Sequence, residues 1–239
     1  MAVTNTPPPK KSDLGVRTLS ALVMLAVAGT ALWLGGWWWT VFVAAVALGV
    51  LWEWWGLSKA IARNWSGRAL WLTAGMAYVG PAAALMNYLN GWPGLVERDT
   101  TAWRLLVLLI CSVIATDIGA YFAGRTFKGP KIAPRISPSK TWAGLIGGAA
   151  ASGSVWAIVY SRFSDMGGAS VMGFVFGTLL AVIAQTGDFF ESWMKRRAGV
   201  KDSGSLIPGH GGLFDRVDGL LAVLFVIGIL TLAGTIAKS

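Results

Sequence analysis

The sequence predicts an all-α, polytopic integral membrane protein with about seven transmembrane helices. Of its 239 residues, 55% are hydrophobic and 13% are charged, whereas a soluble domain carries about a quarter charged residues. A helix that crosses a membrane needs roughly 20 mostly apolar residues. Seven stretches of the chain meet that requirement: residues 16–35, 37–57, 69–89, 103–124, 141–160, 169–190 and 218–236.

The basic residues predict which ends of these helices face the cytoplasm. With a cytoplasmic N-terminus, 16 of the 20 Lys and Arg residues fall on the cytoplasmic side and 4 on the opposite side. This distribution follows the positive-inside rule and supports the count of seven spans. It also accounts for the net charge of +9, so we expect no nucleic-acid partner, although such a partner is common for basic proteins.

Apart from the predicted helices, the sequence indicates a short tail and a single domain. We expect residues 1–15 to form a disordered cytoplasmic tail and residues 16–239 to form a single transmembrane domain. Lys10 and Lys11 precede the first apolar run, as in a signal peptide, but no clear cleavage site follows and a second run starts at once. The single cysteine, Cys111, excludes a disulfide framework and is expected to be a small buried hydrophobic residue.

One aspartate lies inside the fourth apolar run, "CSVIATDIGAYFAGR". Asp117 is eight residues before Arg125, which marks the inner end of that helix, and so lies roughly 12 Å deeper. A carboxylate at that depth is costly unless it is paired, hydrated or bound to a metal, and it usually marks a functional interior. The alternative is a carboxyl group that forms a hydrogen bond between helices.

The sixth run ends in "AQTGDFFESWMKRR" and carries a polar stripe. Asp188, Glu191, Ser192 and Lys195 follow the spacing of one helical face. A solvated Glu191–Lys195 pair at a helix end is an alternative interpretation, but it explains Asp188 poorly. In the second run, Glu53 is expected to be an interfacial anchor or a helix–helix contact.

The segment between the fourth and fifth runs, "GRTFKGPKIAPRISPSKTWAG", combines five basic residues with three prolines. Its prolines and glycines predict set turns rather than a long helix. Ser139 or Lys140 is expected to begin the next helix near Thr141, where free backbone N–H groups favour anions. The segment therefore predicts either a phosphate-binding lid or a loop that touches anionic lipid head groups.

The densest polar segment is "KDSGSLIPGHGGLFDRVDG", residues 201–219. It brings Asp202, Asp215 and Asp218 together with Lys201, Arg216 and the only histidine, His210. Carboxylates with few other ligands suit Mg²⁺, which shares its coordination with phosphate oxygens, whereas zinc lacks a ligand set here. His210 beside glycines is also compatible with a simple turn residue. Together with the lysines and arginines, these carboxylates predict phosphoryl or nucleotidyl transfer on a lipid-borne substrate.

A family resemblance rests on the same residues. The stretch "SWMKRRAGVKDSGSLIPGHGGLFDRVD" resembles the signature of phosphatidate cytidylyltransferases, also called CDP-diacylglycerol synthases, with S-x-x-K-R, K-D, H-G-G and D-R-x-D in order. The segments "QTGDFFES" and "DIGAYFAGR…GPK…ISPSKTWAG" are also similar, so the resemblance is closest over residues 112–225. It implies an enzyme of a bacterial-type inner membrane that joins CTP to phosphatidate of the inner leaflet, with one or two Mg²⁺ ions, for phospholipid biosynthesis.

The resemblance also implies roles for individual residues. The metal ligands would be Asp188 and Asp215. Catalytic residues around the triphosphate or the phosphatidate head would be Lys195, Lys201, Asp202, His210 and Arg216. Further substrate-binding residues would be Asp117, Ser137, Ser139, Lys140, Ser192, Arg196 and Asp218. One departure is Ala143, where many relatives carry Glu or another polar residue.

Two other functions stay open from the residues alone. One is a CTP-dependent lipid kinase of the polyprenol or phytol type, and the other is an ion-coupled transporter in which Asp117 and Asp188 relay ions. The small residues of 144–153, "GLIGGAAASG", permit close helix packing, either within the chain or in a homodimer.

Overall fold

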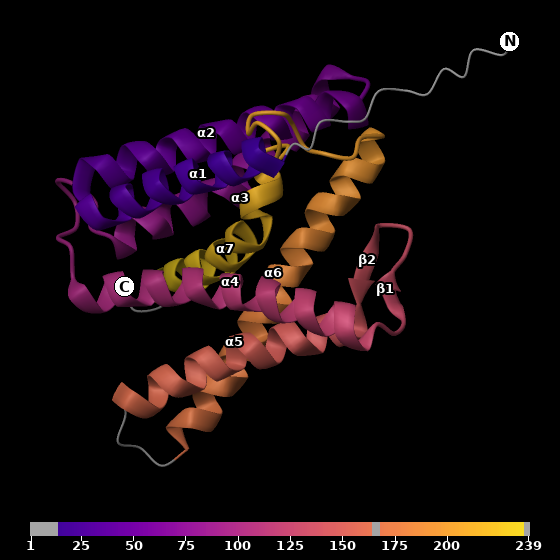
Figure 1. Cartoon of the computed structure of the whole chain (residues 1–239). Coiled ribbons are helices and arrows are strands. Elements are labelled where there is room, and N and C mark those ends of the chain that lie inside the picture. Colours follow the sequence, from indigo (N-terminus) through magenta and orange to yellow (C-terminus); the bar gives the residue numbers. More distant parts are fainter. Residues whose placement is uncertain (1–13, 164–167, 237–239) are drawn as a thin grey trace, which may run out of the picture.

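The computed structural model describes residues 14–163 and 168–236, and within them it contains seven long helices that run back and forth (Figure 1). The helices are α1 (Leu14–Leu34), α2 (Gly36–Ile61), α3 (Trp65–Leu89), α4 (Thr100–Phe127), α5 (Trp142–Phe163), α6 (Ala169–Ala198) and α7 (Phe214–Ile236). All seven are long and apolar enough to cross a membrane, which confirms the predicted class. The predicted tail lies outside the described residues over 1–13, and Leu14 and Gly15 already belong to α1.

Each helix extends beyond at least one predicted end, and in α6 and α7 the extension falls in the polar signature. α6 continues eight residues past position 190 and stops at Gly199, whose φ of 73° is the left-handed conformation that glycine adopts readily. Three basic residues in its last turn face the negative end of the helix dipole. α7 begins at Phe214 rather than at 218. The polar signature therefore consists of a helix end, a loop and a helix start rather than one long loop.

The loop between α4 and α5 folds into a small hairpin, which the sequence analysis did not predict. Strand β1 (Lys131–Ala133) pairs antiparallel with β2 (Ser137–Thr141). The N-cap of α5 is also one residue later than predicted. Thr141, rather than Ser139 or Lys140, accepts the backbone N–H of Gly144 through its hydroxyl, at 3.0 Å. The cap thus lies at the base of the hairpin and fixes it to α5.

Small residues hold α4, α5 and α6 together. A Cβ atom added to Gly119 would lie 2.5 Å from the carbonyl oxygen of Gly147, so the two helix backbones are in direct contact. The hydroxyls of Ser112 and Ser152 lie 2.6 Å apart, and Ser152 also donates to the carbonyl of Gly177 on α6 at 2.8 Å. The small residues of 144–153 are therefore used for packing within the chain.

Aromatic rings form the core of the other half. Trp54 of α2 is 1% exposed, and its ring contacts Trp71 and Tyr78 of α3, Phe190 of α6 and Phe214 of α7. Its indole N–H donates to the carbonyl of Trp71 at 2.7 Å. This aromatic cluster fixes α2 against the start of α7, next to the polar segment 201–219.

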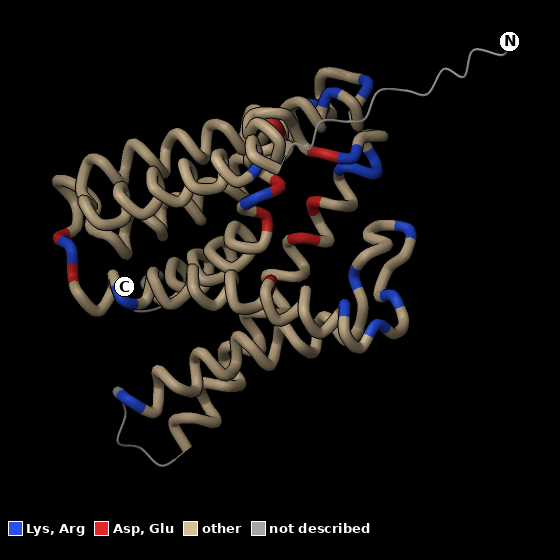
Figure 2. Tube along the Cα trace, viewed as in Figure 1, with Lys and Arg blue, Asp and Glu red and all other residues tan. Residues whose placement is uncertain are grey.

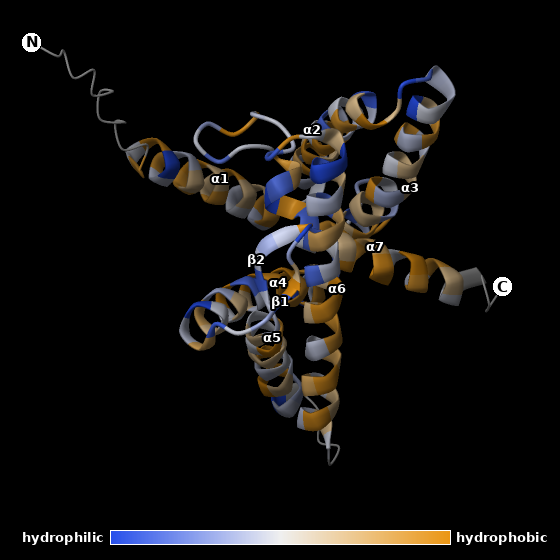
Figure 3. Cartoon of the chain, turned by 90° about the vertical axis from the view of Figure 1, so that its right-hand side faces the viewer, coloured by the Kyte–Doolittle hydropathy of each residue, from blue (hydrophilic) through white to orange (hydrophobic). Residues whose placement is uncertain are grey.

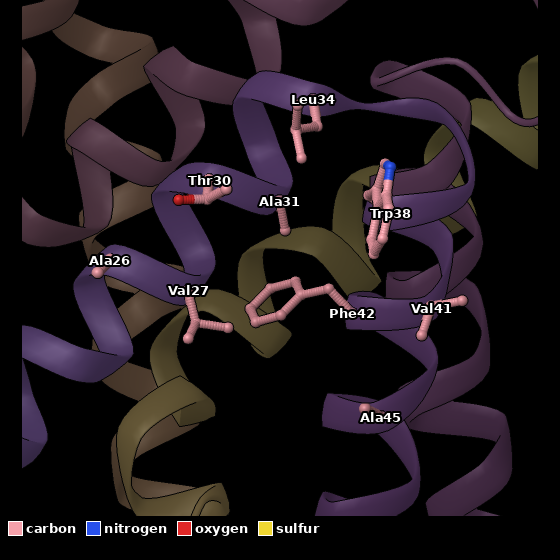
Figure 4. A pocket seen from close by; sticks show the side chains of 9 residues that line it. All are labelled: Ala26, Val27, Thr30, Ala31, Leu34, Trp38, Val41, Phe42 and Ala45. Atoms are coloured by element: carbon pink, nitrogen blue, oxygen red, sulfur yellow. The ribbon is translucent and has the colours of Figure 1, made fainter.

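The first helix is held mainly at its ends. An apolar crevice of about 510 Å³ lies between α1 and α2, lined by side chains such as Val27 and Phe42 (Figure 4). At one end Arg98 donates to the carbonyls of Leu32 and Trp33, at 3.1 and 2.9 Å. At the other end the hydroxyl of Ser20 lies 2.9 Å from His210 Nδ1. α1 is therefore tied directly to the predicted catalytic loop.

Charge is distributed unevenly along the bundle. Figure 2 shows most Lys and Arg at the end that carries the hairpin, and most Asp and Glu just to their left, nearer the middle of the bundle. Figure 3 shows hydrophobic residues along the helices and hydrophilic residues at the hairpin and adjoining loops. Cys111 is exposed on α4, so its predicted burial is wrong, because it lines an open groove between α4, the end of α3 and α5.

The contact between α4 and α5 can be tested with one methyl group. In Gly147→Ala, the new Cβ would overlap Ala123 and lie 2.8 Å from the carbonyl oxygen of Gly119. We expect the free energy of unfolding to fall by about 1–3 kcal/mol, as for other overpacked sites. Gly56→Ala is the matched control, because nothing lies within 4 Å of a Cβ there. Thermal unfolding in detergent micelles measures both, and equal melting temperatures would contradict the packing.

Candidate functional site

Seven charged residues meet at the polar end of the bundle, where β2 and helices α4, α6 and α7 come together. We call them the carboxylate–lysine cluster: Asp117, Lys140, Asp188, Glu191, Lys195, Asp215 and Asp218. Figure 2 shows several acidic positions on different helices close to this end of the bundle. All seven residues were predicted from the sequence as polar groups of interest, and the structure brings them together.

The first part of the cluster is an ion pair between the hairpin and α6. Lys140 of β2 contacts Asp188, and the two side chains are 25% and 22% exposed. Burial lowers the pKa of Lys140 below its ordinary value, while the negative charges of Asp117, Asp218 and Glu191 oppose that shift. Lys140 is thus surrounded by carboxylates from three different helices.

The second part is a triad that joins α6 to α7. Lys195 Nζ lies 2.6 Å from Glu191 Oε2 and 2.5 Å from Asp215 Oδ1. The Glu191 side chain is 2% exposed, and its other oxygen, Oε1, has no hydrogen-bond partner. One lysine therefore contacts two carboxylates but can balance the charge of only one, and a buried carboxylate oxygen is left without a donor.

The second oxygen of Asp215 is bound to the preceding loop. Asp215 Oδ2 accepts the backbone N–H and the hydroxyl of Ser203, both at 2.9 Å, and the backbone N–H of Gly212 at 2.8 Å. A side chain at Gly211, where φ is 85°, would lie 3.3 Å from the same oxygen and 3.4 Å from Asp202. The glycines of "PGHGG" therefore allow the loop to close around Asp215.

The remaining carboxylates complete a charge imbalance. Asp218 accepts the backbone N–H of Gly219 at 2.8 Å and interacts electrostatically with Lys140 and Lys195. Asp117 is exposed on α4 and interacts with Lys140 and Asp218. Five carboxylates thus share two lysines, which leaves a formal surplus of three negative charges when all are ionised. Such a surplus at a membrane boundary attracts cations.

The other predicted residues lie around this cluster and mostly fix the loops. Arg216 donates to the carbonyl of His210 at 2.8 Å, and Lys201 and Asp202 are exposed. Arg196 donates to the carbonyl of Ile136 in the hairpin at 3.3 Å. Three serines lie nearby on β2 and α6: Ser137 is buried, its hydroxyl is 3.5 Å from that of Ser139, and Ser192 is half-buried.

Glu53 of α2 is the residue whose importance the sequence analysis missed. Its side chain accepts the backbone N–H groups of Leu213 and Phe214, at 2.9 and 2.8 Å, and the hydroxyl of Ser203, at 2.9 Å. Glu53 is 3% exposed, so it is no interfacial anchor, but its bond to Phe214 at the start of α7 confirms the other expected role, a helix–helix contact. The available signal was a single acid inside "LWEWWGL", but its partners lie some 150–161 positions away in the sequence.

The cluster fits a hard divalent cation only in part. Within residues 14–163 and 168–236, no three His, Cys, Asp or Glu side chains are grouped closely enough to hold a metal ion alone. Mg²⁺, however, usually takes one or two carboxylates and completes its coordination with water and phosphate oxygens. The surplus negative charge and the unpartnered Glu191 Oε1 are what such an ion needs. The residues therefore fit a cation that arrives with a phosphate-bearing ligand.

Comparison with known proteins gives a consistent result. The model of the cytidylyltransferase family matches residues 15–97 and 76–233. The chain is 39% identical to the phosphatidate cytidylyltransferase of Brucella suis over 246 residues, which cover 88% of this chain and 90% of that protein. It is 33% identical to that of Rickettsia felis over 234 residues, covering 92% and 94%. With that of Pseudomonas aeruginosa it shares 36% identity over 186 residues, covering 74% and 65%.

The triad predicts a large loss of stability on removal of its cation. Lys195→Met leaves Glu191 and Asp215 without their common partner, and we expect the free energy of unfolding to fall by about 3–5 kcal/mol. Lys201→Met removes an exposed lysine and should change it by no more than about 0.5 kcal/mol. Thermal unfolding at neutral pH compares the two variants, and equal stability would show that the triad contributes little.

Proposed function

This chain belongs to the cytidylyltransferase family, and we propose that its carboxylate–lysine cluster is where CTP reacts with phosphatidate. The reaction transfers the cytidylyl group of CTP to phosphatidate, giving CDP-diacylglycerol and pyrophosphate for phospholipid biosynthesis. The observation that carries the proposal is the convergence of the family's signature residues, from α6, the loop and α7, on one charged cluster at the end of a membrane bundle.

The reaction needs charge control more than proton transfer. An anionic phosphate oxygen of phosphatidate forms a bond to the α-phosphorus of CTP. The bond from that phosphorus to the oxygen bridging to the β-phosphorus breaks, and its electron pair leaves with pyrophosphate. Because the attacking and leaving oxygens are both anionic, no general base is required. The barrier lies in bringing two polyanions into line, so positioning and electrostatic stabilisation do the catalysis.

The two lysines of the cluster would bind phosphate oxygens of the substrates. In the structure Lys140 is paired with Asp188, and Lys195 with Glu191 and Asp215. When CTP binds, both ammonium groups can turn from carboxylate to phosphate oxygens without leaving the cluster, since each has three N–H donors. The carboxylates they release become available to cations that accompany the triphosphate.

One or two Mg²⁺ ions would be held by Asp188 and by Oδ1 of Asp215. Bound there, Mg²⁺ neutralises the triphosphate and stabilises the pyrophosphate leaving group. Oδ2 of Asp215 does not serve this purpose, because three donors from the loop already occupy it. Asp117 and Asp218 add negative charge that favours binding of the cation.

The surrounding residues contact the two substrates. Lys201, Asp202, His210 and Arg216 belong to the 201–213 loop and the start of α7, and from there they would orient the substrates. Arg196 and Ser192 of α6, with the hairpin serines Ser137 and Ser139, would bind phosphate groups of the substrates from the side of α6 and β2. Both sets lie at the polar end of the bundle, next to the apolar helix surfaces that a diacylglycerol moiety requires.

The same arrangement supports a location in the bacterial inner membrane. The seven apolar helices make the chain a multi-pass membrane protein, and the relatives named above are bacterial. The excess of Lys and Arg at the cluster's end supports a cytoplasmic position for that end, where CTP is made. Phosphatidate then reaches the cluster from the inner leaflet.

Product analysis tests the proposed reaction. We expect purified protein in mixed detergent–lipid micelles with Mg²⁺ to convert CTP and phosphatidate into equal amounts of pyrophosphate and CDP-diacylglycerol, and chelation of the metal to stop it. CDP as the nucleotide product would indicate a lipid kinase instead. Intact CTP under all conditions would favour the transporter. Either result contradicts the proposal.

The carboxylate assignment has its own test. We expect Asp188→Asn and Asp215→Asn each to lower turnover by at least about a hundredfold, as for loss of strong electrostatic stabilisation. Glu97→Gln makes the same chemical change at an exposed acid on the opposite end of the bundle and should leave turnover unchanged. Steady-state kinetics of folded variants measures this, and near-normal turnover in the Asp188→Asn/Asp215→Asn double variant would remove the metal assignment.

A further inference from the structure

We propose that Glu53 is a positioning residue for the reaction, although it lies on α2, far in sequence from the signature. Its carboxylate holds the loop 201–213 and the first turn of α7 in the one arrangement that points Asp215 Oδ1 at Lys195. This inference rests on the proposed function, because it assigns to Glu53 the placement of a residue of that site.

The contacts of Glu53 all fall on the two ends of the loop. Oε1 accepts the backbone N–H of Leu213, and Oε2 accepts the backbone N–H of Phe214 and the hydroxyl of Ser203. The N–H groups belong to the start of α7, which is the positive end of its dipole, so a carboxylate there is stabilised. Glu53 thus caps α7 from another helix, while Ser203 brings the start of the loop to the same point.

Ser203 links Glu53 directly to the cluster. Its hydroxyl lies 2.9 Å from Glu53 Oε2 and 2.9 Å from Asp215 Oδ2. A serine hydroxyl has one hydrogen, so it donates to one of these carboxylates at a time and couples their positions. Lys195 then contacts the other oxygen of Asp215. A continuous chain of contacts therefore runs from α2 through the loop to the lysine that the cluster uses.

The residues around Glu53 and Ser203 are so closely packed that two neighbouring positions admit only glycine. A Cβ atom at Gly204 would lie 2.5 Å from Glu53 Oε1, and one at Gly212 would overlap the Ser203 hydroxyl and lie 2.6 Å from Glu53 Oε2. Both glycines are therefore required for the loop to reach the carboxylate. They are part of the signature, whereas Glu53 lies outside its region of closest resemblance.

Glu53 acts through other residues and does not touch substrate. Both of its oxygens accept backbone N–H groups and its side chain is 3% exposed, so it has no access to substrate. A neutral amide cannot replace it. In Glu53→Gln, the NH₂ group would face a backbone N–H or the serine hydroxyl, and at least one donor of the loop would lose its partner.

The test combines hydrogen exchange with kinetics in the full chain. In Glu53→Gln we expect amide exchange over residues 203–214 to rise by about tenfold or more, since one charge-assisted bond is lost. Exchange in α4, α5 and α6 should stay unchanged. We expect kcat to fall by about 10- to 100-fold, the range that a misplacement of about 1 Å causes, in a protein that remains folded at the assay temperature.

Two further variants keep the test decisive. Glu97→Gln is the control for the chemical change and should alter neither exchange nor kcat. Ser203→Ala cuts the link to Asp215 but leaves the backbone bonds of Glu53, so it should lower kcat with a smaller rise in exchange. The double variant Glu53→Gln/Ser203→Ala should lose less activity than the product of the single losses, because both changes break one chain of contacts.

Each remaining outcome overturns the inference. Unchanged exchange over 203–214 would mean that Glu53 does not hold the loop. A local rise with normal kcat would mean that the loop's placement does not matter. A rise throughout the chain, with activity falling only as the folded fraction falls, would indicate a purely structural role. Absence of cytidylyl transfer in the unaltered protein would refute the proposed function instead, and the exchange data would still report on the anchor.

Discussion

The arrangement of the polar end depends on the cost of burying negative charge where water is scarce. Five carboxylates lie at the end of a membrane bundle, and each must find a donor or a cation. The structure meets this demand by drawing Lys140 from the hairpin, Lys195 from α6, and backbone N–H groups from the 201–213 loop. These same contacts hold the hairpin, α6, the loop and α7 together. Charge compensation is therefore also what assembles the end of the bundle.

The two halves of the bundle contribute differently to this assembly. Helices α4, α5 and α6 are packed through small residues, so their backbones touch and leave little freedom. They provide a stiff frame for Asp117, Asp188, Glu191 and Lys195. Asp215, by contrast, stands on α7, whose start is fixed to α2 by Glu53 and the aromatic cluster around Trp54. The site thus lies between the closely packed helices α4, α5 and α6 and the start of α7, which α2 holds in place.

The charge imbalance connects this architecture to the proposed chemistry. In the structure the lysines satisfy part of the cluster, yet a formal surplus of three negative charges and one unpartnered Glu191 oxygen remain. In the proposed reaction, a triphosphate with its cations would reverse this situation, since the cations would take the carboxylates and the lysines the phosphates. The cluster is therefore suited to a ligand that brings both charges at once, and less suited to a bare anion. Its place at the end of apolar helices lets a lipid phosphate reach the same point from the membrane.

Local properties of the sequence determined much of this protein. Seven spans could be predicted because hydrophobicity over about 20 residues suffices to place a helix in a membrane. The polar stripe of α6 and the acids of 201–219 could be identified because they interrupt apolar runs, and the signature in that region predicted the family. Errors arose where local patterns were ambiguous, as for the hairpin at 131–141 and the exposed Cys111.

Only the tertiary structure decided which group compensates which charge. Lys140 and Asp188 are 48 positions apart, and Glu53 and Phe214 are 161 apart, so no local pattern links them. Such pairs depend on how the helices pack and on how closely glycines let the backbones approach. For the same reason the sequence could not show that Glu53 binds the start of α7. The sequence alone determined which residues are polar within the membrane, and packing alone determined their partners, because the energy of a buried charge depends on distances that only the folded chain defines.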